Sequence, residues 1–123
     1  MKTRNKGFTL IELMVGVAIL LIVIIATLGS FIYCMLLNES SKNIAMASND
    51  AQYALEQIKN ISFNNIPAYI QNYPSTQFAN LPNESITFPN PVYTSTLDTI
   101  VVEITWNERN VQKTFTLTTC FAA

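Results

Sequence analysis

One long run of uncharged residues constrains this chain more than any other feature. From Leu13 to Leu37 there are 25 consecutive residues without a charge, and 15 of them are Leu, Ile, Val or Phe. As a helix with a rise of about 1.5 Å per residue, the run would be about 37 Å long, which is enough to cross a hydrocarbon layer of about 30 Å. The run therefore predicts one membrane-spanning helix, with the carboxylate of Glu12 at its amino end.

Basic side chains are concentrated before this run. Lys2, Arg4 and Lys6 are three of the seven in the 123-residue chain, so the positive-inside rule places the amino terminus in the cytoplasm. Residues 8–123 hold four basic and eight acidic side chains, a net charge of −4, and this distribution offers no basic patch for nucleic acid. A cleaved secretory signal is the alternative, but its apolar region normally has about 7–15 residues, so a permanent anchor is favoured.

The helical pattern continues beyond the apolar run. Apolar residues recur there at spacings of three and four, and charged residues occupy the other face. This pattern predicts one long helix over residues 8–61, apolar all round in its first half and amphipathic in its second. The apolar positions are Ile44, Ala47, Ala51, Ala54, Leu55, Ile58 and Ile61, and the charged ones are Glu39, Lys42, Asp50, Glu56 and Lys59.

The C-terminal part of the chain reads as loop followed by strands. Residues 62–83 are rich in Asn, Pro, Ser and Tyr and are expected to form a loop with a short helical turn. Strands are predicted at 84–88, 99–106 and 111–121, the last two joined as a hairpin by the four residues 107–110. The expected fold is α+β, with the amphipathic half of the helix packed on a small antiparallel sheet of three or four strands.

Groups that could support catalysis are sparse. The chain has no histidine, no cysteine cluster and no glycine after Gly29, so phosphate-binding and calcium-binding loops are not expected. Cys34 and Cys120 lie in different parts of the chain and are expected to be unpaired. We therefore expect neither an enzyme nor a bound metal or cofactor. The acidic residues of the C-terminal part are scattered and expected in solvent: Glu84, Asp98, Glu103 and Glu108.

Glu12 has a purely structural explanation. Thr9 and Glu12 match a capping box, in which a hydroxyl at the N-cap and a carboxylate three residues later satisfy the free amides of a helix start. The capping box does not explain why the basic residues stop abruptly at Gly7. Gly16 and Gly29, inside the apolar run, are either contact or softening points of the helix or simply tolerated.

The sequence KGFTLIE, residues 6–12, follows a short basic leader and precedes the apolar run. It resembles the prepilin cleavage and methylation motif of type IV pilins and pseudopilins. The resemblance implies that a prepilin peptidase cuts between Gly7 and Phe8 and that the new amine of Phe8 is N-methylated. It divides the chain into a cleaved leader (1–7), a transmembrane and filament-core half of the helix (8–37), an amphipathic half (38–61) and an outer globular domain (62–123).

The resemblance also implies a role for Glu12 and a set of partners. In a filament of staggered subunits, the Glu12 carboxylate of one chain would pair with the Phe8 ammonium of the next and so hold the subunits in register. The expected partners are the prepilin peptidase and methylase, other pilins or pseudopilins through the helix, and inner-membrane lipid before assembly. The chain would be a bacterial single-pass inner-membrane protein with its C-terminal domain outside the cytoplasm, and later part of a filament.

The end of the chain suggests a subtype. VVEITWNERNVQKTFTLTT, residues 101–119, resembles the terminal hairpin of V-type minor pilins and of small minor pseudopilins, with Trp106 before a polar turn. Major pilins often end in a disulfide-closed loop, whereas this region has one cysteine. We therefore expect a minor subunit that initiates or caps a type IV pilus, or fimbrium. A type II secretion pseudopilin is the first alternative, and an uncleaved single-span membrane protein with an outer β-domain is the second.

Overall fold

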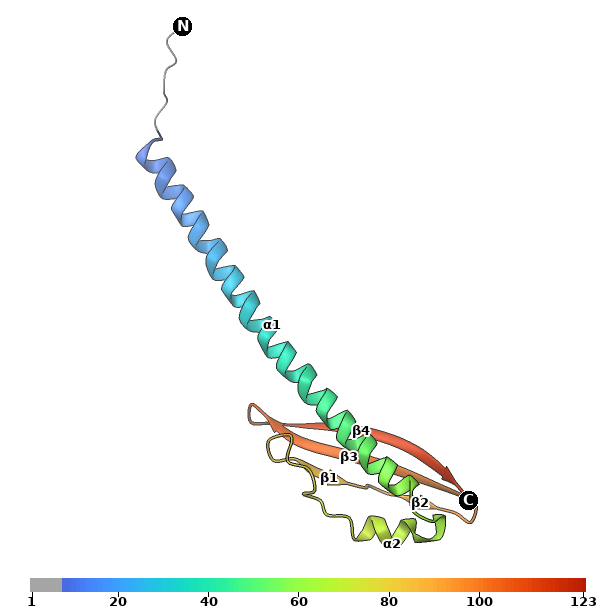
Figure 1. Cartoon of the computed structure of the whole chain (residues 1–123). Coiled ribbons are helices and arrows are strands. Elements are labelled where there is room, and N and C mark those ends of the chain that lie inside the picture. Colours follow the sequence, from blue (N-terminus) through green and yellow to red (C-terminus); the bar gives the residue numbers. More distant parts are fainter. Residues whose placement is uncertain (1–7) are drawn as a thin grey trace. The chain divides into compact units, whose positions relative to one another are not determined.

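The computed structural model of the chain describes residues 8–123, so Gly7 and the rest of the predicted leader lie outside the described residues. The fold is α+β and pilin-like, with one long amino-terminal helix and a four-stranded antiparallel sheet, as the sequence predicts (Figure 1). Its elements are α1 (Leu10–Lys59), η1 (Phe63–Asn65), α2 (Ile66–Gln71), β1 (Ser85–Thr87), β2 (Val92–Tyr93), β3 (Leu97–Glu108) and β4 (Val111–Ala122).

Helix α1 runs through both of the compact units into which the chain divides. The first unit ends at Glu39 and the second comprises Ser40–Ala123. Within the first unit every described side chain is exposed, and an 18-residue window of α1 has a mean hydropathy of 2.8. Among the described residues, α1 is the one helix that is long and apolar enough to cross a membrane.

The sheet is organised around β3. Strands β1 and β2 pair with β3 on one side and β4 pairs with it on the other, all antiparallel. The β3–β4 ladder is continuous from Leu97–Ala122 to Glu108–Val111, without a bulge. Strand β3 is therefore the central strand and β4 forms one edge of the sheet.

The turn between β3 and β4 is shorter than predicted. The predicted four-residue linker 107–110 is wrong, because Asn107 and Glu108 continue β3 and pair with β4. Only Arg109 and Asn110 form the turn, with φ values of 52° and 63°. Positive φ at both central positions defines a two-residue turn whose twist matches that of the flanking strands. Asparagine tolerates this left-handed region better than most residues, which suits a chain without glycine after position 29.

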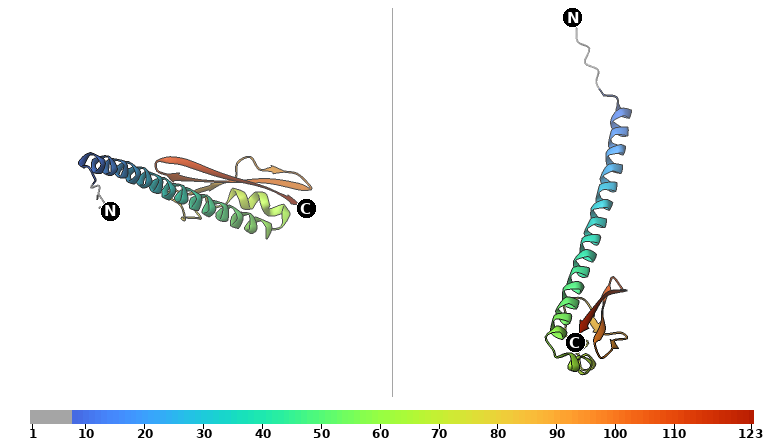
Figure 2. Two further views of the ribbon diagram at one scale, coloured as in Figure 1. Left: turned by 90° about the horizontal axis from the view of Figure 1, so that it is seen from above. Right: turned by 90° about the vertical axis from the view of Figure 1, so that its right-hand side faces the viewer.

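The core lies between the second half of α1 and one face of the sheet (Figure 2). Ile100, Val102 and Ile104 are fully buried and Trp106 is 2% exposed, so the predicted alternation along β3 is confirmed. Each such side chain contributes about 1.5–3 kcal/mol relative to an exposed position. Three alanines of α1 are fully buried against this core and allow the helix to approach the strand closely: Ala47, Ala51 and Ala54.

The segment between α1 and β1 also contributes to the core. The predicted short helical turn within 62–83 is confirmed as η1 and α2. From α2, Ile66 and Ile70 are buried. The hydroxyls of Tyr69 in α2 and of Tyr73 just after it both donate to Gln57 Oε1, at 3.1 and 3.3 Å. These bonds hold α2 against α1.

Several polar and apolar positions differ from the expectation. Asp50 was expected on the polar face of the helix, and Glu84, Asp98 and Glu108 in solvent, but all four are buried, with 2–8% of their surface exposed. Each carboxylate accepts hydrogen bonds from a nearby amide, which offsets the loss of water. Conversely, Ile44 of the predicted apolar face is 47% exposed, since the buried stretch of α1 begins at Ala47.

Candidate processing and assembly site

The residues of the predicted processing site lie at the start of α1. Gly7, on one side of the predicted cleavage point, is outside the described residues. Phe8, on the other side, is 80% exposed and precedes the first helical residue, Leu10. The Phe8 amide is therefore not part of the helical hydrogen-bond ladder, and an amine created there would be free to make other contacts.

Thr9 precedes the helix and caps its start. The backbone N–H of Glu12 donates to Thr9 Oγ1, at 3.4 Å, and the N–H of Leu13 donates to the Thr9 carbonyl, at 3.2 Å. The bond to the hydroxyl is one of the two that a capping box requires. It leaves the Glu12 carboxylate available for another partner.

A shallow groove surrounds the Glu12 side chain. Phe8, Glu12, Gly16 and Leu20 are spaced by four and lie on one face of the helix. Because Gly16 has no side chain, the face is hollow there, and a Cβ added at this position would meet nothing within 4 Å. The groove measures about 410 Å³ and is completed by Leu13 and Val17. The Glu12 carboxylate is the one charged group among the residues that line this groove.

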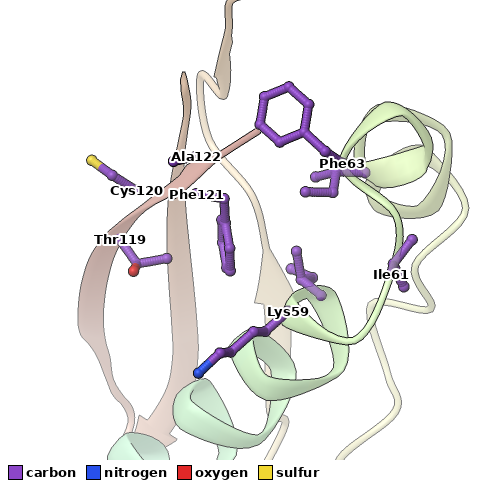
Figure 3. A pocket seen from close by; sticks show the side chains of 9 residues that line it. Lys59, Ile61, Phe63, Thr119, Cys120, Phe121 and Ala122 are labelled. Carbon is purple, nitrogen blue, oxygen red and sulfur yellow. The ribbon is translucent and has the colours of Figure 1, made fainter. Parts of the chain in front are cut away.

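A second groove lies in the C-terminal unit, where α1, η1 and β4 end near one another. It measures about 440 Å³. Figure 3 shows the Phe121 ring and the Lys59 side chain in the space between α1 and β4, whereas the Cys120 thiol points away. Its lining residues are Ile58, Lys59, Ile61, Phe63, Ile66, Thr119, Cys120, Phe121 and Ala122.

Three of the four buried carboxylates of this unit belong to two separate structural clusters. In one, Asn80 bridges two acids, because its side-chain amide donates to both oxygens of Asp50, at 3.0 Å, and its backbone N–H donates to Glu84 Oε2, also at 3.0 Å. Burial raises the pKa of Glu84, and the neighbouring Asp50 raises it further, against the opposing effect of the Leu81 and Asn80 amides. These contacts fasten the loop before β1 to α1.

The second cluster surrounds Glu108 at the end of β3. Its carboxylate accepts a hydrogen bond from Asn43 Nδ2, at 3.1 Å, and this bond lowers the pKa of Glu108. The indole nitrogen of Trp106 is buried without a hydrogen bond of normal geometry, yet it lies close enough to the carboxylate to lower the same pKa. Within residues 8–123 no group of three or more His, Cys, Asp or Glu side chains could hold a metal ion. Both cysteines are free.

Comparison with protein-family models explains the amino-terminal site. Residues 2–28 match the prokaryotic N-terminal methylation motif. The chain carries a type IV pilin-like prepilin signal. This prepilin signal includes Gly7, Phe8 and Glu12 and extends into the apolar run as far as Leu28. No curated protein and no solved structure matches the chain.

The structure brings together some residues that sequence patterns had left separate. Along α1, the spacing of Phe8, Glu12 and Gly16 by four could have indicated the groove in advance. The groove beside Lys59 and Phe121 had no such signal, because its walls come from elements about 60 residues apart in the sequence.

Proposed function

We propose that this chain is a structural subunit of a type IV pilus or a related filament, processed by prepilin peptidase between Gly7 and Phe8, and not an enzyme. The observation that carries the proposal is the prepilin signal at residues 2–28, which leads into an exposed apolar helix. The pilin-like fold of the remaining chain supports it. Before assembly the subunit is held in the inner membrane, with its amino end in the cytoplasm and its C-terminal unit outside.

Cleavage would create a positive charge that can pair with the Glu12 carboxylate. The new amino terminus at Phe8 is cationic at neutral pH, and N-methylation keeps it so. An unpaired carboxylate costs about 3 kcal/mol at the middle of a membrane and less near its edge, where Glu12 would lie, and a neighbouring subunit's ammonium offsets much of that cost. Glu12 lines a shallow groove that Gly16 leaves open, so a neighbour's helix end could approach it there. Pairing of Glu12 with Phe8 of the next subunit then favours one register between the two helices.

The C-terminal unit favours a minor subunit that initiates or caps the filament. Cys120 is free, so the end of the chain is not closed by a disulfide. The hairpin of β3 and β4 has a two-residue turn, and Trp106 near its turn end is buried in the core, with 2% of its surface exposed. The same features fit a minor pseudopilin of a type II secretion system, and the filament from which the chain is recovered separates these two functions.

Mass spectrometry of the intact chain and of its amino-terminal peptide, purified from its native membrane, tests the processing step. We expect a chain that begins at N-methylated Phe8, and one that begins at Met1 in a strain without prepilin peptidase. A chain that still begins at Met1 in the presence of the active peptidase contradicts the proposal and favours an uncleaved anchored β-domain protein.

Substitution of Glu12 tests the assembly step. We expect Glu12→Gln and Glu12→Ala to leave the amount of chain in the membrane unchanged and to lower its recovery in sheared filaments by about tenfold. A tenfold loss corresponds to about 1.4 kcal/mol of lost pairing free energy. Glu56→Gln is the matched control, because Glu56 is an exposed acid on the same helix. Normal recovery of both Glu12 variants would show that the carboxylate has no part in assembly.

A further inference from the structure

Strand β4 is an edge strand of unusual length. It comprises 12 residues, pairs with β3 along one side, and has no strand on the other side within the described part of the chain. On the opposite side of β3, the neighbouring strands β1 and β2 have only three and two residues. The backbone groups along the outer side of β4 thus form the longest open edge of the sheet.

The register identifies which backbone groups face outward. The N–H of Ala123 donates to the Thr96 carbonyl, at 3.1 Å, so the pair 96–123 is a hydrogen-bonded pair. Because such pairs alternate along an antiparallel ladder, the odd-numbered residues of β4 bond to β3 and the even-numbered ones direct N–H and C=O away from it. Thr114, Thr116 and Thr118 are therefore at the open edge.

This edge lacks the usual protection against pairing with another chain. Natural edge strands are normally short, or carry charges, prolines or bulges. Strand β4 has no proline, no bulge and a single charged side chain, Lys113. An extended segment could pair along its whole length.

The side chains beside the edge are also incompletely covered. On the α1-facing side of the sheet, the β3 residues are buried, whereas Phe115, Leu117 and Phe121 of β4 pack against the core but remain half-buried. At the end of β4, the space next to α1 widens into the groove of about 440 Å³ (Figure 3). Lys59 is the only charged residue among those that line it.

We propose that β4 binds an extended strand of a different filament subunit, which adds to the sheet at this edge. Alternate side chains of that strand would be apolar, to cover Leu117 and Phe121, and one would be a carboxylate beside Lys59. The identity of the partner as a filament subunit rests on the proposed function. The side chains proposed for the added strand rest on the open edge of β4, its half-buried apolar side chains and the charge of Lys59.

A second copy of this chain is disfavoured by geometry. Antiparallel pairing of two β4 strands in one continuous sheet requires a two-fold axis perpendicular to the sheet. The second half of α1 lies in a layer against the sheet, so this rotation would reverse its direction. The two copies of residues 40–59 would then run in opposite directions, and each chain would continue toward its apolar segment from an opposite end of the pair, which disfavours anchoring of both copies in one membrane.

The test is photocrosslinking of the full chain in its native membrane, with a photoreactive amino acid in place of Thr116. We expect a product with an extended segment of another subunit that carries a prepilin signal. Thr118→Pro removes one outward N–H and should lower the yield about fivefold or more, as expected for one lost hydrogen bond. Thr118→Ala keeps that N–H and should leave the yield unchanged.

Charge reversal provides an independent variant. Lys59→Glu should lower the yield severalfold, whereas Lys42→Glu, at an exposed position of the same helix, should not. The emission of Trp106, the only tryptophan, reports whether each variant is folded. If Thr118→Pro is misfolded, the comparison of Lys59→Glu with Lys42→Glu decides the question.

The outcomes separate this inference from the proposed function when the amino terminus is read by mass in the same sample. A chain that begins at Phe8 but gives no product, or a product only between two copies of itself, overturns the β4 inference and leaves the proposed function intact. The inference is also overturned if folded Thr118→Pro and Lys59→Glu variants give the same yield of crosslinked product as the chain without these substitutions. Capture of a strand by a chain that still begins at Met1 supports strand addition and contradicts the proposed function.

Discussion

The side-chain amide of Asn43 donates a hydrogen bond of 3.1 Å to the carboxylate of Glu108, which is 65 residues away in the sequence. Asn43 belongs to α1 and Glu108 is the last residue of β3, so the bond ties the turn end of the β3–β4 hairpin to the helix. Asn43 is the main cause of the lowered pKa of Glu108, with smaller contributions from Trp106, Ser40 and Arg109 that burial partly opposes.

Removal of this amide should destabilise the chain in a pH-dependent way. The pKa of Glu108 is lower in the folded chain than its unfolded value of about 4.3, so its stabilising contribution is present above that value and is lost as the pH falls through the folded pKa. We expect Asn43→Ala to lower the melting temperature at pH 7 and to have a smaller effect at pH 3. Thermal unfolding of the full chain in detergent, followed by Trp106 emission, measures both. Asn49→Ala, at an exposed position of α1, is the control, and an equal loss at the two pH values would contradict the assignment.

Glu84 should show the opposite dependence on pH. One of its oxygens accepts the backbone amides of Asn80 and Leu81, at 3.0 and 3.1 Å, and the other is buried without a partner in the described structure. Its pKa is raised, mainly by burial and further by Asp50, so its contribution is most favourable below the unfolded value of about 4.3 and is lost as the pH rises through the folded pKa.

Glu84→Gln should therefore stabilise the chain at high pH. Glutamine retains an oxygen for the two backbone amides, and its amide group can donate to Asp50 without a charge. We expect the melting temperature to rise by a few degrees at pH 8 and the gain to disappear toward pH 4. Glu56→Gln, at an exposed position, should change little. A lower melting temperature at every pH would show that the carboxylate is held by contacts that glutamine cannot replace.

The small residues of α1 should not tolerate enlargement. Ala54 is fully buried, so Ala54→Leu adds three carbon atoms where the helix approaches β3. Overpacking of this kind lowers the free energy of unfolding by about 1–3 kcal/mol. Denaturant unfolding of the full chain measures the change, with Ala45→Leu on the exposed face as the control. Equal stability of the two variants would mean that the helix and the sheet can move apart without loss.

Gly16 should be required for assembly and not for folding. A Cβ at Gly16 or Gly29 meets nothing within 4 Å, so leucine is sterically allowed at both positions in the isolated chain. Only Gly16 lines the groove around Glu12. We expect Gly16→Leu to lower recovery in sheared filaments severalfold at an unchanged membrane level, and Gly29→Leu to have a smaller effect. Equal effects of the two variants would indicate a general change in the helix and no role for the groove.

Local patterns predicted the features that depend on neighbours in the sequence. The absence of charge over residues 13–37 and the capping position of Thr9 specify an apolar helix and its start, since both arise within a few turns. The alternation of Ile100, Val102, Ile104 and Trp106 similarly specifies one buried face of β3. The prepilin signal is also contained in one continuous segment, so the motif could be recognised without a structure.

Tertiary structure decided where distant elements meet. Asp50, Glu84 and Glu108 have polar side chains that sequence patterns assign to solvent, and they are buried because amides from Asn80, Leu81 and Asn43 reach them only in the folded chain. The same holds for the open edge of β4 and the groove beside Lys59, which exist because α1 lies over β3 and leaves the outer strand partly uncovered. Burial and hydrogen bonding between residues far apart in sequence are properties of their packing, and no local period encodes them.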